Sequence, residues 1–432
     1  MVALLYYLLG PTHWYVAVIL LTLFSLICLI SHGTLYEIRP SSEHLTRFYL
    51  AVAFGGWLGG AAVSLVAPLA FRGLYEYPAL LLLFVAVFFW CRHSHVKEIL
   101  PDFTTLGALR VVLIVLVITQ LGRAIYHRQD VMFQHRNFYG TYRVIEGPSA
   151  VDATRKIRKL VHGAQWLDGT DRAEPISYYY RGGAISQVFT AVQPPRNIAV
   201  VGLGTGAAAA YAGAQDRMTF YEIDPDIEQV AHHWFTYLGD SMVMQRIVVG
   251  DGRLVMQSEQ SNHPKYDIVL VDAFTGDGIP VHLLTCEALA VYMASLEKDG
   301  LLLLHVSNRY YVLQPLIKAV AQELNLYGAI NISVAKSRVR QDQIDKNCVV
   351  LSRSRSSLQP LLEAGWVLLG EDDLDRMEPW TDDYINILEP MWKGMKTKYS
   401  EWKMDTFFRW IHDLGIDGPA YSPGPISYPD KH

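Results

Sequence analysis

The chain has 432 residues, which is enough for two or three domains. Its formal net charge is −5, and Lys and Arg form no long runs, so the composition argues against a nucleic-acid-binding protein. Apolar residues crowd roughly the first 125 positions, whereas the remainder has the composition of a water-soluble domain.

Four apolar segments at residues 13–31, 47–70, 77–91 and 108–125 approach the ~20 residues that a helix needs to cross a bilayer. Four in succession predict a transmembrane helical region over residues 1–128. Gly55, Gly56, Gly59 and Gly60 in the second segment favour close helix packing. Arginines at positions 123, 128 and 136 follow the last segment, so we expect a multi-pass protein of the inner (cytoplasmic) membrane with a cytoplasmic catalytic domain that contacts membrane lipids.

The four cysteines have no paired spacing that would suggest a disulfide framework or a metal site. They are Cys28, Cys91, Cys286 and Cys348. We expect them to be small, buried apolar side chains.

Residues 129–190 are predicted to form a small antiparallel β region. Aromatic and β-branched residues alternate over Gln134–Val144, and basic and apolar residues alternate over Thr154–Gln165. The triplet Tyr178–Tyr180 follows, and it fits either a packing cluster or the wall of a pocket for an organic cation.

Residues 191–355 are predicted to form a Rossmann-like α/β domain of about seven strands, the last antiparallel, before a carboxyl-terminal extension over residues 356–432. An apolar strand at Asn197–Val201 runs into a turn that contains Gly202, Gly204 and Gly206. The next three strands end at Glu222, Asp251 and Asp272. Open parallel sheets bind ligands at the carboxyl edge, where these residues would meet.

The residue types at this edge suit a nucleoside. Glycines let the backbone approach a ligand closely, and Glu222 follows the second strand, where an acid accepts the hydroxyls of a ribose. Asp251 is placed to accept from an adenine amino group, and Asp272 faces the reacting group. A glycine turn alone also suits NAD, but the acids after strands two, three and four favour an S-adenosyl nucleoside.

Other polar residues have structural interpretations. Asp224 fits a turn or strand end, and His162 and His282 are expected to cap or pack. Asp382 and Asp383 either cap a helix that begins near Tyr384 or close over the pocket.

Several motifs together resemble the spermidine synthase (polyamine aminopropyltransferase) family. They are Arg136–Gly140, Leu160–Gln165, Gly202–Gly206, Tyr221–Pro225 and Asp272–Thr285. Phe48–Gly60 and Trp380–Tyr384 are similar to the membrane-fused branch of the family. The resemblance implies a class I methyltransferase-like fold after a helical membrane region, a homodimer and a metal-free transfer from decarboxylated S-adenosylmethionine or S-adenosylmethionine.

The resemblance also implies roles for individual residues. Gln165 would contact the donor, Tyr178 would line the amine pocket, Asp272 would act as general base and Asp277 would hold the amine. The expected catalytic residues are therefore Tyr178, Asp272 and Asp277, and the expected donor-binding residues are Gln165, Gly202, Gly204, Thr205, Gly206, Glu222, Asp251 and Gly252.

The chain departs from the family pattern at three positions. Thr205 replaces the aspartate that pairs with the donor's aminopropyl ammonium, and Gly140 and Tyr179 replace glutamines. Three functions therefore stay open: aminopropyl transfer to a small amine, methyl or 3-amino-3-carboxypropyl transfer to a lipid-associated acceptor, and nucleoside sensing at the membrane without catalysis.

Overall fold

The computed structural model describes residues 14–73, 75–91, 130–149, 154–160, 163–167, 173–261, 263–273, 280–308, 311–331, 347–370 and 376–394. The chain divides into two compact units, Met1–Arg143 and Val144–His432. This division falls within a β-strand of the small β region, and the expected domain boundaries stay a prediction.

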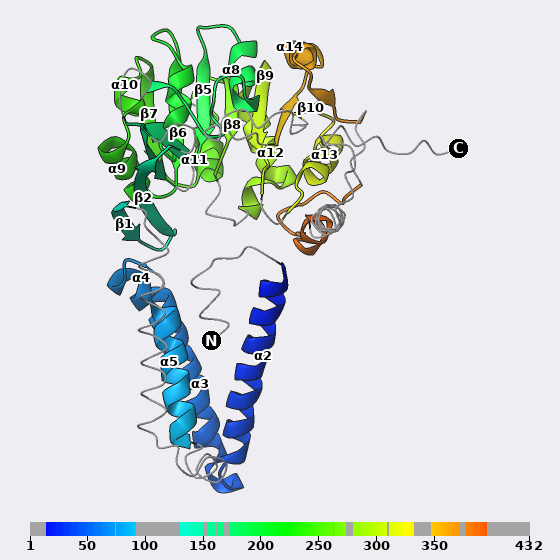
Figure 1. Ribbon diagram of the computed structural model, residues 1–432. Coiled ribbons are helices and arrows are strands. Elements are labelled where there is room, and N and C mark those ends of the chain that lie inside the picture. Colours follow the sequence, from blue (N-terminus) through cyan, green and yellow to red (C-terminus); the bar gives the residue numbers. More distant parts are fainter. Residues whose placement is uncertain are drawn as a thin grey trace, which may run out of the picture. The chain divides into compact units, whose positions relative to one another are not determined.

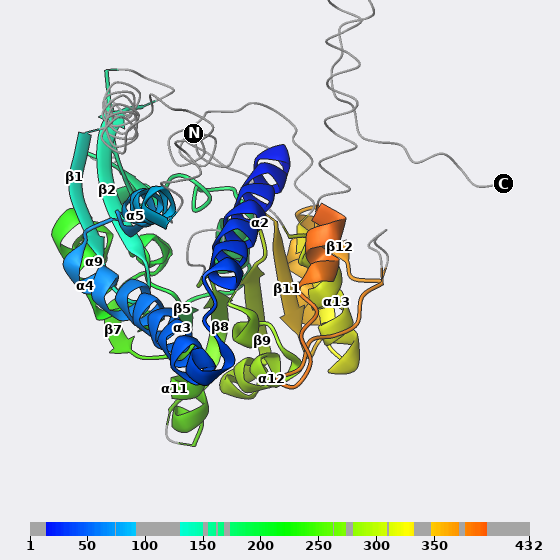
Figure 2. The same ribbon diagram turned by 90° about the horizontal axis from the view of Figure 1, so that it is seen from below.

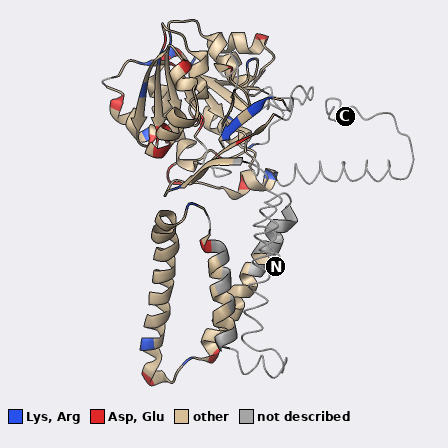
Figure 3. Cartoon of the chain, turned by 60° about the vertical axis from the view of Figure 1, so that its left-hand side comes forward, with Lys and Arg blue, Asp and Glu red and all other residues tan. Residues whose placement is uncertain are grey.

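Long apolar helices dominate the amino-terminal unit (Figure 1). They are α2 (Trp14–Glu37), a continuous run of η1 (Ser42–His44), α3 (Leu45–Ala61), η2 (Ala62–Val66) and α4 (Ala67–Ala70), and then α5 (Glu76–Cys91). Lys, Arg, Asp and Glu lie near the ends of these helices, and their long middles carry none (Figure 3).

Among the described residues, one helix is long and apolar enough to cross a membrane, namely the 29-residue run Ser42–Ala70. At 1.5 Å per residue it extends about 43 Å, more than the ~30 Å hydrocarbon core. The third expected span, α5, has only 16 residues, and the fourth, residues 108–125, lies outside the described residues. The expected region of four transmembrane helices is therefore unconfirmed, and a multi-pass location is not supported.

The glycines of the second expected span do not serve as a packing face within the described part of the chain. A Cβ atom built on Gly55, Gly56, Gly59 or Gly60 would meet nothing within 4 Å. The expected close packing at these positions therefore has no partner in this part of the chain.

The small sheet contains β1 (Asp130–Arg136), β2 (Thr141–Pro148), β3 (Lys156–Leu160) and β4 (Gly163–Trp166), in that order. β2 pairs antiparallel with β3, and β3 with β4, as the alternating pattern predicted. In the amino-terminal unit, Arg136 of β1 donates to both carboxylate oxygens of Glu76 at 2.7 and 2.8 Å. This ion pair ties the strand to the start of α5.

The large sheet of the second unit has eight strands in the order β12-β10-β11-β9-β8-β5-β6-β7 (Figures 1 and 2). These are β5 (Asn197–Val201), β6 (Arg217–Glu222), β7 (Met244–Val249), β8 (Tyr266–Val271), β9 (Leu296–His305), β10 (Tyr327–Asn331), β11 (Cys348–Ser352) and β12 (Val367–Leu368). Strands β5 to β9 pair in parallel, and β11 is antiparallel to both of its neighbours. The class I methyltransferase-like fold is confirmed, with β12 as one strand more than expected.

Helices cover the sheet and account for its apolar strands. They are α8 (Ala184–Ala191), η4 (Ala207–Tyr211), α9 (Pro225–Trp234), α10 (Tyr237–Asp240), α11 (Gly252–Glu259), η5 (Val281–Leu283), α12 (Cys286–Ser295), α13 (Gln314–Glu323), η6 (Ser356–Leu358) and α14 (Gln359–Glu363). Met256, Leu289 and Leu316 bring α11, α12 and α13 into one core cluster with Val201 and Val269 of the sheet. Strands that are buried in this way have nearly continuous apolar sequences.

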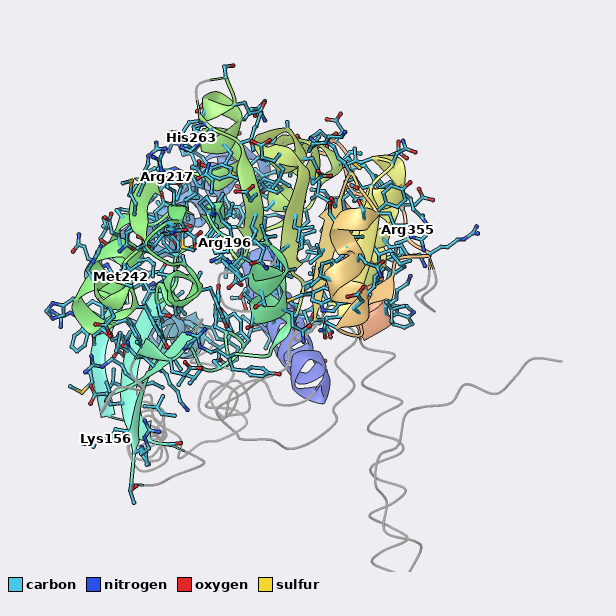
Figure 4. All side chains as sticks on the ribbon, turned by 90° about the horizontal axis from the view of Figure 1, so that it is seen from above. Lys156, Arg196, Arg217, Met242, His263 and Arg355 are labelled. Carbon is cyan, nitrogen blue, oxygen red and sulfur yellow. The ribbon has the colours of Figure 1, made fainter. Side chains whose placement is uncertain are left out.

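A buried ion pair joins the starts of β5 and β6. Arg196 donates to Asp216 Oδ2 at 2.6 Å, and the two side chains are 7% and 0% exposed. Figure 4 shows Arg196 among packed side chains, whereas Arg217 and His263 lie nearer the periphery. Burial alone would raise the pKa of Asp216, but hydrogen bonds from Arg196 and the backbone outweigh it and lower that pKa.

The segment around Trp380 packs against α11 and α12. The Trp380 ring is fully buried, and its carbonyl accepts from the Cys286 amide at 2.8 Å. Asp382 accepts from Arg253 of α11 at 2.5 and 2.8 Å and from the Thr285 hydroxyl at 2.9 Å. Asp382 therefore bridges two helices and does not cap the following helix, which begins at residue 388.

Candidate active site

The turn after β5 is built for a close approach of backbone segments. Gly202 has φ +99°, and a Cβ atom there would lie 2.4 Å from the Asp272 carbonyl oxygen. Gly204 and Gly206 have φ +54° and +78°, a conformation that side chains other than glycine rarely adopt. The turn therefore lies directly against the end of β8.

Glu222 ends β6 beside this turn and is 8% exposed. Its Oε2 accepts from the Leu203 amide at 2.9 Å, and its Oε1 accepts from the Asp224 amide at 3.0 Å. Burial raises the pKa of Glu222, and the backbone hydrogen bonds oppose that rise. Each carboxylate oxygen accepts more than one hydrogen bond, so the hydroxyls of a ribose can add to these contacts.

Asp251 and Gly252 form the start of α11. Asp251 Oδ1 caps the helix by accepting from the Leu254 amide at 3.0 Å, and its Oδ2 lies 3.1 Å from His282 Nε2. A Cβ atom on Gly252 would lie 2.7 Å from Val201, so this glycine brings α11 close to the end of β5. His282 is thus a partner of Asp251.

Asp272 lies at the centre of a buried polar cluster at the ends of β8 and β9. Its Oδ2 accepts from the Tyr179 hydroxyl at 2.6 Å, and its Oδ1 lies 2.6 Å from His305 Nδ1. The Asp272 and His305 side chains are 5% and 6% exposed. An ionised carboxylate only accepts hydrogen bonds, so Nδ1 of His305 carries the proton in this pair.

Tyr178 completes the cluster. Its ring stacks on the His305 imidazole, with 4.8 Å between the ring centres and 25° between the planes. Its hydroxyl is buried and has no hydrogen-bond partner among the described residues. Burial first, and then the Asp272 charge, raise the pKa of Tyr178, so it stays protonated near neutral pH.

Gln165 and Thr205 are also buried, at 1% and 2% exposed. The Gln165 amide pairs with Thr236, donating to its hydroxyl at 2.6 Å and accepting from its backbone amide at 3.1 Å. The Thr205 hydroxyl has no hydrogen-bond partner in the part of the chain that the structure describes. The donor-binding roles of both residues stay predictions.

Sequence reasoning missed two members of the cluster, Tyr179 and His305. The signal for His305 was present, because it ends the apolar strand Gly300–His305 at the same sheet edge as Asp272. Tyr179 was noted in the Tyr178–Tyr180 triplet and as a departure from the family pattern, but not as a partner of Asp272. Asp277 and His162 lie outside the described residues.

The remaining polar residues and the cysteines have structural roles where the structure describes them. Asp224 caps α9 by accepting from the Asp226 amide at 2.9 Å, as its turn interpretation predicted. Cys286 and Cys348 are buried, as expected for small apolar side chains, whereas Cys28 is only half-buried, contrary to that expectation. No three His, Cys, Asp or Glu side chains of the described residues gather as a metal site would require, and the metal-free reaction stays a prediction.

No protein-family model matches the chain. Among curated proteins, it is 28% identical over 179 residues to the polyamine aminopropyltransferase of Vibrio vulnificus, which covers 41% of this chain and 55% of the relative. It is 26% identical over 291 residues to the N-terminal histidine N-methyltransferase of Emericella nidulans, which covers 63% of this chain and 49% of that relative.

Among solved structures, a probable spermidine synthase from Corynebacterium glutamicum covers 59% of this chain and 98% of its own, at 15% identity and a TM-score of 0.41. A spermidine synthase in complex with the transition-state analogue AdoDATO covers 58% of this chain and 82% of its own, at 12% identity and a TM-score of 0.38. The chain spans about half the length of the curated relatives that it matches, and both of these relatives are transferases.

Proposed function

We propose that this protein is a transferase that uses an S-adenosyl nucleoside as co-substrate and alkylates an amine. The observation that carries the proposal is the meeting of Glu222, the Gly202 turn and Asp272 at one edge of the sheet. The homology to a polyamine aminopropyltransferase supports the same reaction class.

In this proposal, the donor lies along the carboxyl edge of β5 to β8. Glu222 binds the ribose, Asp251 accepts from the adenine, and the glycine turn lies under the sulfonium end. The Asp251 carboxylate is 21% exposed, which leaves it accessible to a ligand. Decarboxylated S-adenosylmethionine and S-adenosylmethionine are the two candidate donors.

Asp272 supplies the negative charge at the reacting centre. The sulfonium carbon of the donor is already activated, so the chemical problem is to present a neutral nitrogen to it. A base in the cluster around Asp272 must take the proton from the acceptor, and general-base help of this kind is typically worth about 10²–10⁴-fold in rate. Orientation of the two substrates adds to that gain.

The test is transfer by the purified full-length protein with each donor and a panel of amines. We expect methylthioadenosine or S-adenosylhomocysteine to accumulate with at least one acceptor. Asp272→Asn should lower the rate by about 10²-fold or more while the donor still binds. Absence of both nucleoside products with every acceptor contradicts the proposal, and tight nucleoside binding without turnover then favours the sensor function.

Thr205 supports a second candidate function, methyl or 3-amino-3-carboxypropyl transfer to a membrane-associated acceptor. Its hydroxyl is buried without a partner among the described residues, and it is neutral, so it suits a donor that keeps its carboxylate. The fungal relative is a methyltransferase. The by-product distinguishes the reactions, because methyl transfer leaves S-adenosylhomocysteine and both propyl transfers leave methylthioadenosine.

The proposal includes attachment to a membrane through the amino-terminal unit. The Ser42–Ala70 helix supports it, since Leu50, Phe54, Trp57 and Leu58 are all more than half exposed. A cytoplasmic catalytic unit, a homodimer and a lipid-associated acceptor are further parts of the proposal.

A further inference from the structure

His305 occupies a position where its chemistry can serve the proposed transfer. It ends β9, one register position beyond the Val271–Leu304 pair, so it lies beside Asp272 at the ligand-binding edge of the sheet. Its Nδ1 donates to Asp272 Oδ1 over 2.6 Å. This bond fixes the orientation of the imidazole ring and leaves Nε2 as its basic nitrogen.

Asp272 itself already accepts hydrogen bonds from the protein at both oxygens. His305 Nδ1 contacts Oδ1, and the Tyr179 hydroxyl donates to Oδ2 over 2.6 Å. Hydrogen bonds to the ionised form stabilise a carboxylate and make it a weaker base. The bond between His305 Nδ1 and Asp272 orients the imidazole, the carboxylate stabilises the imidazolium that forms when Nε2 takes a proton, and the Tyr179 hydroxyl holds the carboxylate in place.

The groups that face His305 come from three elements. Asp272 follows β8, Tyr178 and Tyr179 precede α8, and Cys348 of β11 is the register partner of His305. Burial is the main reason that the pKa values of Tyr178, Tyr179 and Cys348 are raised, so these three stay neutral near pH 7. The Asp272 carboxylate is therefore the charged member of the cluster.

The Tyr178 hydroxyl indicates where a ligand would lie. It is buried, it has no hydrogen-bond partner among the described residues, and its ring stacks on the His305 imidazole. A buried hydroxyl without a hydrogen-bond partner is unfavourable, and a bound polar group would supply that partner. A polar ligand group that bonds this hydroxyl would lie near the His305 ring on which Tyr178 stacks.

We propose that His305 is the catalytic base of the transfer and that Asp272 is its positioning residue. This inference rests on the proposed function. His305 Nε2 removes one proton from the acceptor ammonium, and the neutral nitrogen then forms a bond to the donor carbon. The carbon–sulfur bond breaks with its electron pair going to sulfur, so a neutral thioether leaves, and the product is a substituted ammonium.

Substitution of His305 distinguishes a purely structural role of the His305–Asp272 pair from a catalytic one. If His305 only held two strand ends together, His305→Gln would lower thermal stability and donor affinity together. As a base, His305→Gln lowers kcat by about 10²–10⁴-fold, with a donor Kd within about threefold of wild type. His263→Gln is the matched control, because this half-buried imidazole stacks on Tyr266 at the start of β8, at the opposite end of the strand from Asp272.

The experiment combines kinetics with the protonation pattern of the ring in the full-length protein. In ¹⁵N-histidine-labelled protein, the signals that disappear in His305→Gln should be those of an imidazole that carries a proton on Nδ1. Imidazole added to His305→Gly should restore part of the lost rate, and the acid limb of the wild-type kcat/KM profile should change in His305→Gln. A ring protonated at Nε2, or a variant with wild-type kcat, overturns the inference.

These outcomes separate the two proposals. If no donor and acceptor pair turns over with the wild-type protein, the proposed function fails, and with it the catalytic role of His305. If the wild-type protein turns over and His305→Gln does so equally well, only the role of His305 fails. Asp272→Asn should shift the ring toward the Nε2-protonated form, since an amide oxygen and nitrogen can both pair with Nδ1.

Discussion

At the scale of single residues, burial and backbone contacts decide what each acid at the sheet edge can do. Glu222 and Asp272 both follow apolar strands, yet one bonds to backbone amides and the other to side chains. Backbone amides hold the Glu222 carboxylate in place, as the proposed ribose contact requires. Among the side-chain partners of Asp272 is the His305 imidazole, a group that can transfer a proton.

Glu222→Gln should weaken donor binding by about 10–100-fold, because a hydrogen bond to a charged group is worth about 1.5–3 kcal/mol. Isothermal titration with each candidate donor measures this effect. Glu297→Gln, at an exposed position of β9, is the control and should bind the donor like wild type. Equal affinity in the two variants would refute a ribose contact at Glu222.

Donor affinity should also depend on pH through Glu222. Burial raises the pKa of this carboxyl above its ordinary range, so it takes up a proton at a higher pH than an exposed glutamate does. The carboxylate form is the one that accepts from two hydroxyls, and we therefore expect affinity to fall as the pH drops through the raised pKa. A pH titration of Kd in wild type and Glu222→Gln checks this, and the variant should lack the dependence.

Gly202→Ala should destabilise the protein and abolish donor binding. The left-handed backbone at φ +99° costs about 1–3 kcal/mol for a residue with a side chain, and the new methyl group would overlap the Asp272 carbonyl oxygen at 2.4 Å. The loss of stability is measured as the change in Tm. Gly213→Ala is the control, because a Cβ atom at Gly213 meets nothing within 4 Å. A normal Tm in Gly202→Ala would contradict the close approach of the two segments.

At the scale of elements, strand starts and strand ends have separate tasks. Asp216 and Arg196 fix the starts of β5 and β6 by a buried ion pair, while the opposite ends of these strands carry the glycine turn and Glu222. The stabilising ion pair and the proposed ligand site thus lie at opposite edges of one sheet.

Arg196→Met should lower the free energy of unfolding by about 3–5 kcal/mol, because it leaves the Asp216 carboxylate buried without its cation. Arg217→Met is the control, because it removes an exposed arginine that directly follows Asp216 in the chain (Figure 4). Denaturant unfolding measures both. In wild type, the lowered pKa of Asp216 gives stability above the ordinary aspartate pKa that is lost as the pH falls through the lowered value.

The sequence predicted the sheet edge well because strand, turn and acid are local patterns. Glu222 and Asp272 could be identified as strand-end acids, and β10 and β11 could be placed near their observed positions. Contacts between distant segments had no such signal: Tyr179 and Asp272 are 93 positions apart, and Arg253 and Asp382 are 129 apart. Asp382 was given two roles, and its partner Arg253 was not among the candidates.

At the scale of the whole molecule, the two units differ in the kind of surface that they present. The described helices of the amino-terminal unit expose large apolar side chains along their length, whereas the second unit buries its apolar residues around the sheet. One membrane-length helix is modest support for insertion, so a direct measurement is needed.

Flotation of the full-length protein with phosphatidylcholine vesicles should carry it to the lipid fraction. Phe54→Arg with Leu58→Arg puts two charges on one face near the middle of the Ser42–Ala70 helix, at a cost of about 2.5–3.5 kcal/mol each in a bilayer. We expect this variant to float less, and His44→Arg, near the helix start, to float normally. Unchanged flotation of the double variant would exclude this helix as the membrane contact.

The bridge from Asp382 to Arg253 and Thr285 has a practical consequence for shortening the chain. Trp380 is buried beside α12, and Asp382 forms an ion pair with Arg253 of α11. A protein that ends before residue 376 would lose this buried indole ring. It would also leave the Arg253 charge, two residues from Asp251, without its ion-pair partner. Any minimal catalytic fragment must therefore extend at least to Tyr384.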